Sequence, residues 1–184
     1  RRLLDFAREK TPEKTYADVN QMIEECTQLI NQSAHMADIG IVTELNSEQP
    51  AVWMDAVLVK QVIMNMLVNA QHAIAKDGTI NVSTRLREAP PEAGAQKAGS
   101  PMVEISIRDN GCGISEENLT RVFDPFFTTK GVGKGTGLGL SVSHGTIEAH
   151  RGTIEVESKV GEGTEFRICL PTKSISDENL VSGK

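Results

Sequence analysis

Four short segments of the chain alternate between apolar and polar residues, and this alternation constrains the fold more than any other feature. Successive side chains of a β-strand point to opposite faces of the sheet, so such strands bury one face and leave the other in water. Helices are then needed on one side only, which predicts an α+β fold: a two-layer α/β sandwich with a mixed, mostly antiparallel sheet. A doubly wound sheet would require near-continuous apolar strands instead. The four segments are residues 80–86, 103–108, 153–158 and 165–170.

Helices are predicted where apolar residues recur at steps of three and four. The longest covers residues 56–75, with Asp55 as its N-cap and Asp77-Gly78 as the turn that ends it. The remaining predicted elements are helices at 18–37 and 138–150, short strands at 41–45 and 51–54, and a surface loop at 89–101.

Composition excludes several classes of protein. The 184 residues are 39% hydrophobic and 24% charged, which is typical of a globular domain. The net charge of −6 argues against a nucleic-acid partner, and no apolar run approaches the ~20 residues of a membrane helix, so we expect no membrane contact. Cys26, Cys112 and Cys169 have no metal spacing. They predict neither a zinc site nor a disulfide framework and favour a cytoplasmic location.

The two ends of the chain differ from its middle. The sequence begins Arg1-Arg2 without Met, which indicates a fragment of a longer protein. Residues 1–15 are predicted to be the end of a preceding helix, stopped by Pro12, and a linker. Residues 16–172 then form one domain, and residues 173–184 form a polar tail.

The longest predicted helix carries Gln61, Asn65, Asn69 and His72 at spacings of four, four and three, which places them on one face. Asparagine is a poor helix former, so two asparagines on one face of a helix indicate a functional role for their side chains. An amide oxygen suits Mg²⁺, and the amide NH₂ can donate to a phosphate. The alternative is a solvated polar face.

Asp109 closes a predicted strand and is followed by Gly111 and Gly113. The glycines would let the backbone press against a flat ligand, and the carboxylate could accept a hydrogen bond from an exocyclic amine such as that of adenine. An ordinary strand-to-loop turn has the same residues, so both interpretations stay open.

An aromatic segment, residues 123–127, precedes a glycine-rich one that opens a helix. Five glycines fall within residues 131–139, and free N–H groups at a helix start form an anion site. Lys134 is followed by glycine, which excludes a P-loop, and no apolar strand leads into the segment, which disfavours a dinucleotide fingerprint. The aromatic residues would anchor the segment to the core. Residues 161–164 form a hairpin turn.

The order and spacing of these segments resemble the catalytic, ATP-binding domain of bacterial sensor histidine kinases, in the GHKL superfamily. The resemblance covers about residues 16–171 and implies the Bergerat fold of that superfamily. The matching boxes are the N box at 65–73, the G1 box at 109–114, the F box at 123–127, the G2 box at 135–140 and the G3 box at 161–164.

The resemblance implies that the chain binds ATP or ADP with Mg²⁺. Asn69 would coordinate the metal, and Asn65 would support a phosphate or the metal's outer shell. His72 holds a position where the family often has a phosphate-facing basic residue, although a surface histidine is the alternative. Lys130 and the segment 135–139 would form a lid over the phosphates. The catalytic residues implied are Asn65, Asn69, His72 and Lys130.

At the base end, Asp109 would accept the adenine amino hydrogen, Gly111 and Gly113 would let the base approach the backbone, and Thr164 would reach adenine through water. The resemblance implies a nucleotide site made of Asn65, Asn69, Asp109, Gly111, Gly113, Ile114, Phe127, Lys130, Gly135, Thr136, Gly137, Leu138, Gly139, Leu140 and Thr164.

The implied reaction is transfer of the ATP γ-phosphoryl group to a histidine on a separate helical dimerisation domain. Residues 1–8 resemble the end of that domain, but none of His35, His144 and His150 has the acceptor motif. The implied partners are that dimerisation domain, as a homodimer, and a response regulator receiver domain. Two alternatives remain: a GHKL ATPase, whose general-base Glu is replaced here by Asn65, and a non-catalytic nucleotide-binding module.

Overall fold

The computed structural model describes residues 13–48, 50–89, 99–129 and 136–172. These form a five-stranded sheet in the order β2-β4-β5-β7-β6, in which only β2 and β4 run parallel, and a two-stranded antiparallel sheet of β1 and β3. The strands are β1 (Thr15–Ala17), β2 (Ile39–Glu44), β3 (Val52–Met54), β4 (Gly78–Glu88), β5 (Pro101–Asp109), β6 (Thr153–Lys159) and β7 (Gly163–Pro171). The helices are α2 (Val19–Met36), α3 (Ala56–Ala73), α4 (Glu116–Leu119) and α5 (Gly139–Ala149).

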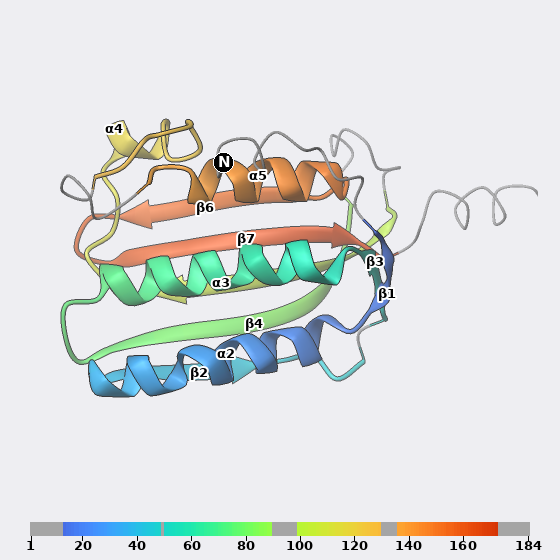
Figure 1. Cartoon of the computed structure of the whole chain (residues 1–184), viewed down its shortest axis with the longest axis horizontal. Coiled ribbons are helices and arrows are strands. Elements are labelled where there is room, and N and C mark those ends of the chain that lie inside the picture. The colour runs from blue at the N-terminus through green and yellow to red at the C-terminus, as the bar shows by residue number, and fades with distance from the viewer. Residues whose placement is uncertain (1–12, 49, 90–98, 130–135, 173–184) are drawn as a thin grey trace, which may run out of the picture.

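Helices α2, α3 and α5 lie side by side on one face of the large sheet, so the predicted α+β two-layer sandwich is confirmed (Figure 1). The apolar side chains of all four alternating strands meet them. The core is made of branched aliphatic residues and methionine, with Ile63 and Leu67 of α3 completely buried above the sheet. Burial of one apolar face of the sheet is therefore what joins the two layers.

Both long helices begin where the sequence predicts. Asp18 accepts hydrogen bonds from two backbone amides of the first turn of α2, and Asp55 does the same for α3. Helix α3 ends at Ala73, two residues before the predicted end. The cause lies in a distant segment, because the carbonyl oxygen of Ala73 accepts a hydrogen bond from the amide of Cys112 at 2.9 Å.

The two short predicted strands exist, but they belong to different sheets. β2 forms the edge of the large sheet, parallel to β4, whereas β3 pairs with β1. β1 was not predicted, because three residues are too few to show an alternation. The predicted helix end at residues 1–9, most of the surface loop at 89–101, and the tail at 173–184 lie outside the described residues.

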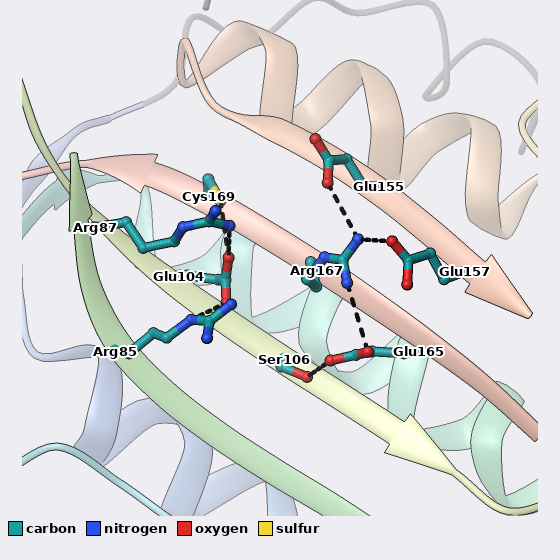
Figure 2. A network of polar contacts seen from close by, with 9 residues as sticks. All are labelled: Arg85, Arg87, Glu104, Ser106, Glu155, Glu157, Glu165, Arg167 and Cys169. Atoms are coloured by element: carbon teal, nitrogen blue, oxygen red, sulfur yellow. Dashed lines mark hydrogen bonds and ion pairs between the residues drawn. The ribbon is translucent and has the colours of Figure 1, made fainter. Parts of the chain in front are cut away.

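The outer face of the large sheet differs from the expected wet surface at Glu104. Its side chain is only 1% exposed, because Arg85 and Arg87 of the neighbouring strand cover it with their stems and bond both its oxygens (Figure 2). Burial raises the pKa of Glu104, but the bonds from the two arginines outweigh burial, and the pKa lies below its ordinary value of 4.5. The expectation of a solvated polar residue at position 104 was wrong.

A second cluster lies beside the first on the same face. Arg167 of β7 is the central cation, and it pairs with Glu155 and Glu157 of β6 and with Glu165 on its own strand (Figure 2). Ser106 of β5 donates a hydrogen bond to Glu165 at 2.6 Å. The two clusters together tie β4, β5, β7 and β6 across the face that has no helices.

The double variant Arg85→Met/Arg87→Met should lose about 3 kcal/mol of stability, because it leaves the Glu104 carboxylate buried without a partner. In the wild type the contribution of this carboxylate is complete above about pH 4.5 and is lost as pH falls through its lowered pKa. In the variant that pKa rises above 4.5, so the stability deficit should grow as pH rises from about 4.5 to about 7.5.

Urea unfolding of both proteins at the two pH values measures this deficit. Arg108→Met is the matched control, since Arg108 is an exposed arginine on the outer face of β5, and it should leave stability nearly unchanged. A deficit of equal size at both pH values would contradict the assignment of Glu104 as the titrating group.

Candidate functional site

A cavity of about 420 Å³ opens at the end of the sheet where β5 ends, between α3 and the start of α5. It brings together residues that the sequence places far apart. The predicted site residues that line it are Asn65, Asn69, His72, Asp109, Gly113, Ile114, Phe127, Thr136, Gly137, Gly139, Leu140 and Thr164.

Two other predicted residues that the structure describes, Gly111 and Leu138, do not line this cavity. Leu138 lines a smaller cavity of about 290 Å³ between α3 and α5, and Gly111 packs against the end of α3. Lys130 and Gly135 lie outside the described residues.

Asp109 is the buried acid of the cavity, with 4% of its surface exposed. One carboxylate oxygen, Oδ1, accepts a hydrogen bond from the amide of Gly111 at 2.8 Å. Burial raises the pKa of Asp109, and backbone hydrogen bonds from Gly111 and Thr164 oppose that rise. The amides thus favour an ionised acceptor in a place where water has little access.

The position of Asp109 depends on close contacts between backbone segments, which occur at glycines because these residues have no Cβ atom. A Cβ on Gly163 would lie 2.0 Å from the carbonyl oxygen of Asp109, and a Cβ on Gly113 would lie 2.1 Å from that of Lys159. Both glycines also have positive φ, at +109° and +70°. Gly111 is similar, since its Cβ would meet the backbone of Ala73 at 2.6 Å. Gly111 and Gly113 therefore let backbone approach backbone, and the close approach to a flat ligand stays a prediction.

Ser158 connects the two sides of this turn, and sequence analysis missed it. Its hydroxyl accepts a hydrogen bond from the amide of Ile114 at 2.8 Å, donates to the carbonyl oxygen of Gly163 at 2.8 Å, and lies 2.9 Å from the hydroxyl of Thr164. The alternation of apolar and polar residues in β6 does indicate that the Ser158 side chain points to the inner face of the sheet. Ser158 occupies the phase of strand β6 in which Ile154 and Val156 face the core.

Helix α3 presents three polar residues to the cavity on successive turns: Asn65, Asn69 and His72. The amide NH₂ of Asn65 donates to the hydroxyl of Ser143 at 3.1 Å, and that hydroxyl donates to the carbonyl oxygen of Gly139. A Cβ on Gly139 would lie only 2.7 Å from the Asn65 amide oxygen. Asn65 therefore holds the first turn of α5 against α3.

The phenylalanines of the aromatic segment, residues 123–127, lie in three different environments. Phe123 packs against the core, and its ring centroid lies 5.1 Å from that of His144. Phe127 lines the cavity, and the guanidinium carbon of Arg121 lies 4.7 Å from the centroid of its ring. Phe126 is 72% exposed and has a φ of +67°, so it does not anchor the segment. The expectation that all three aromatic residues act as anchors was wrong at this position.

His150 holds α3 and α5 together at their other ends. Its Nε2 atom accepts a hydrogen bond from the amide of Asp55 at 2.9 Å, and its Nδ1 atom lies 2.7 Å from the carbonyl oxygen of Thr146. Since Nε2 accepts, Nδ1 carries the proton and the ring is neutral. Burial lowers the pKa of His150, which favours this state. Helix α5, one wall of the cavity, is thus tied to α3 near both of its ends, by Asn65 and by His150.

The described residues hold no group of three or more His, Cys, Asp or Glu side chains that could bind a metal ion. On the α3 side of the cavity, the amide oxygens of Asn65 and Asn69 are hard donors. None of the helices described is both long and apolar enough to cross a bilayer.

Comparison with known proteins decides the family. Residues 54–174 match the model of the histidine kinase-, DNA gyrase B- and HSP90-like ATPases. The chain belongs to this family. The described part of the matched region contains the whole cavity, and the resemblance read from the sequence is confirmed.

Two proteins similar to this chain are histidine kinases. The chain is 37% identical over 169 residues to the signal transduction histidine-protein kinase AtoS of Escherichia coli K12, covering 92% of this chain and 26% of AtoS. It is 30% identical to the catalytic domain of histidine kinase ThkA, with a TM-score of 0.73, covering 87% of this chain and 96% of that domain.

A further solved structure holds histidine kinase ThkA in complex with the response regulator protein TrrA. The likeness to it has a TM-score of 0.72 at 26% identity and covers 94% of this chain and 46% of that one. The chain thus spans about a quarter of the length of AtoS and matches ThkA over its catalytic domain.

Proposed function

We propose that this chain is the ATP-binding catalytic domain of a two-component sensor histidine kinase. The observation that carries the proposal is the cavity itself, because a buried acid from the end of β5 and the amide and imidazole side chains of α3 line the same space. An acceptor for a base and donors for phosphates are thereby held in one space. Family membership supports the same assignment.

The base end of the cavity suits adenine. The Asp109 carboxylate accepts a hydrogen bond from the exocyclic amine, while Ile114 and Phe166 offer apolar surface to the ring. Guanine presents a carbonyl oxygen where adenine has the amine, and this oxygen would repel the carboxylate. Asp109 therefore selects adenine nucleotides.

The phosphate end combines amides with a helix start. The amide oxygen of Asn69 is a hard donor that fits Mg²⁺, which keeps most of its other positions for water and phosphate oxygens. Asn65 supports the same region from one turn earlier, and His72 faces the phosphates. The N-terminus of α5 adds its positive dipole end through residues 136–140, and Lys130 with Gly135 completes the lid over the phosphates.

The reaction breaks the bond between the γ-phosphorus and the bridging oxygen and forms a bond to the imidazole nitrogen of an acceptor histidine, with ADP leaving. Bound Mg²⁺ neutralises the charge on the phosphate oxygens. The residues of this chain bind, orient and exclude water. Asn65 cannot take a proton from water at neutral pH, which favours transfer to an acceptor over the hydrolysis of a GHKL ATPase.

The rest of the parent protein follows from the same proposal. The catalytic domain includes residues 13–172, because Glu13 and Lys14 already bond to Asp55 and Ala149 and because Thr15 begins β1. The domain works in the cytoplasm, as part of a homodimer. A response regulator receiver domain takes the phosphoryl group, by analogy with the ThkA complex.

Phosphoryl transfer tests the activity. The chain alone, incubated with ATP and Mg²⁺, should neither label itself nor release phosphate at an appreciable rate. A fusion to a two-helix dimerisation domain with an acceptor histidine should carry acid-labile phosphate on that histidine. Rapid phosphate release by the chain alone would favour the ATPase alternative, and absence of transfer in the fusion would favour the non-catalytic module.

Nucleotide selectivity tests the site. ATP should raise the thermal unfolding temperature more than GTP does. The variant Asp109→Asn should raise the Kd for ATP at least about tenfold, since it removes a charge-assisted hydrogen bond of ~1.5–3 kcal/mol. Asp77→Asn is the matched control, an exposed aspartate with φ +52° that asparagine tolerates, and it should not change ATP binding. Equal stabilisation of the wild type by ATP and GTP would contradict the assignment of Asp109 as the residue that selects adenine.

A further inference from the structure

We infer that Ser158 is a specificity-determining residue that acts through Thr164. Ser158 fixes the direction of the Thr164 hydroxyl proton, so that the base end of the cavity presents hydrogen-bond acceptors only. This inference rests on the proposed function, because it concerns which nucleotide base the cavity accepts.

Three short contacts surround the Ser158 oxygen. The amide of Ile114 donates to it at 2.8 Å, the carbonyl oxygen of Gly163 lies 2.8 Å away as an acceptor, and the Thr164 hydroxyl oxygen lies 2.9 Å away. Ser158 itself is half-buried and does not line the cavity, whereas Thr164 is buried and does.

Counting protons decides which hydroxyl donates. A serine hydroxyl has one proton and two lone pairs. The proton must point to the Gly163 carbonyl, since two oxygens 2.8 Å apart repel each other without a hydrogen between them. The Ile114 amide uses one lone pair of Ser158, and the other is left for the Thr164 hydroxyl. Thr164 therefore donates to Ser158 and turns its lone pairs to its other side.

The consequence is an acceptor-only edge. Asp109 and Thr164 are register partners on β5 and β7, and both line the cavity. With the Thr164 proton used by Ser158, the Thr164 hydroxyl and the ionised carboxylate can only accept. A 6-aminopurine can supply two N–H groups at position 6 to such an edge, directly or through a bridging water. A 6-oxopurine has its N–H on the ring at N1 and brings an acceptor at position 6, which no proton of this edge can meet.

Ser158→Ala should relax this selectivity. Without the serine oxygen, the Thr164 hydroxyl is free to rotate and donate into the cavity, toward a carbonyl at position 6 of the purine. Inosine triphosphate is the probe, since it has a carbonyl at that position and lacks the additional amine of GTP. We expect the ratio of the inosine triphosphate Kd to the ATP Kd to fall about fivefold, the size of one net hydrogen bond.

A double-mutant cycle separates this role from a structural one. Thr164→Val removes the hydroxyl through which Ser158 acts, so adding Ser158→Ala to Thr164→Val should not change the Kd ratio further. Ser158→Cys keeps the volume with a weak hydrogen-bonding group and should give an intermediate ratio, which covers the case in which the alanine variant fails to fold. Ser106→Ala, on the outer face of β5, is the matched control and should leave the ratio at the wild-type value.

Calorimetric titration of each variant with ATP and with inosine triphosphate measures the ratio. Equal weakening of both nucleotides by Ser158→Ala, with the wild-type ratio preserved, would overturn the inference and leave Ser158 a purely structural residue. A wild-type chain that binds no ATP, or binds both nucleotides equally, would instead refute the proposed function.

Discussion

The close approach of three backbone segments, possible only where Cβ atoms are missing, is the constraint on which the site depends. Gly163 lies against the backbone of Asp109, Gly113 against that of Lys159, and Gly111 against the end of α3. Any side chain at these positions would force the segments apart. Because these segments meet, the Asp109 carboxylate is buried at the end of β5, beside the last turns of α3 that line the cavity.

Helix α3 contributes one face to the core of the domain and another to the proposed nucleotide site. Its apolar side packs on the sheet through residues such as Ile63 and Leu67, while Asn65, Asn69 and His72 face the cavity. The bonds from Asn65 to Ser143 and from Asp55 to His150 fix α5 beside it at both ends. Packing energy from the core therefore holds the cavity walls in place before any nucleotide binds, which lowers the cost of binding.

Local patterns predicted much of the fold and most of the candidate site. The alternation of β4, β5, β6 and β7, the apolar periodicity of α2 and the cap Asp55 are short-range features, and they led to the correct layers and helix starts. Long-range pairing could not be read in this way. The parallel edge strand β2, the pairing of β1 with β3, and the burial of Glu104 all depend on partners far along the chain. The bond from the Ile114 amide to Ser158 is equally long-range, since it joins residues 44 positions apart, whereas the contacts of Ser158 with Gly163 and Thr164 lie within one hairpin.

A crystal structure of the chain with ADP and Mg²⁺ tests the central claim most directly, because the claim is that Asp109 recognises the amine of an adenine base in this cavity. The measured quantity is the distance from the exocyclic amine nitrogen to the nearer Asp109 carboxylate oxygen. The account predicts a hydrogen bond of about 2.7–3.2 Å, with the diphosphate pointing toward Asn69 and the start of α5. An adenine bound elsewhere, or bound here with its amine turned away from Asp109, would contradict it.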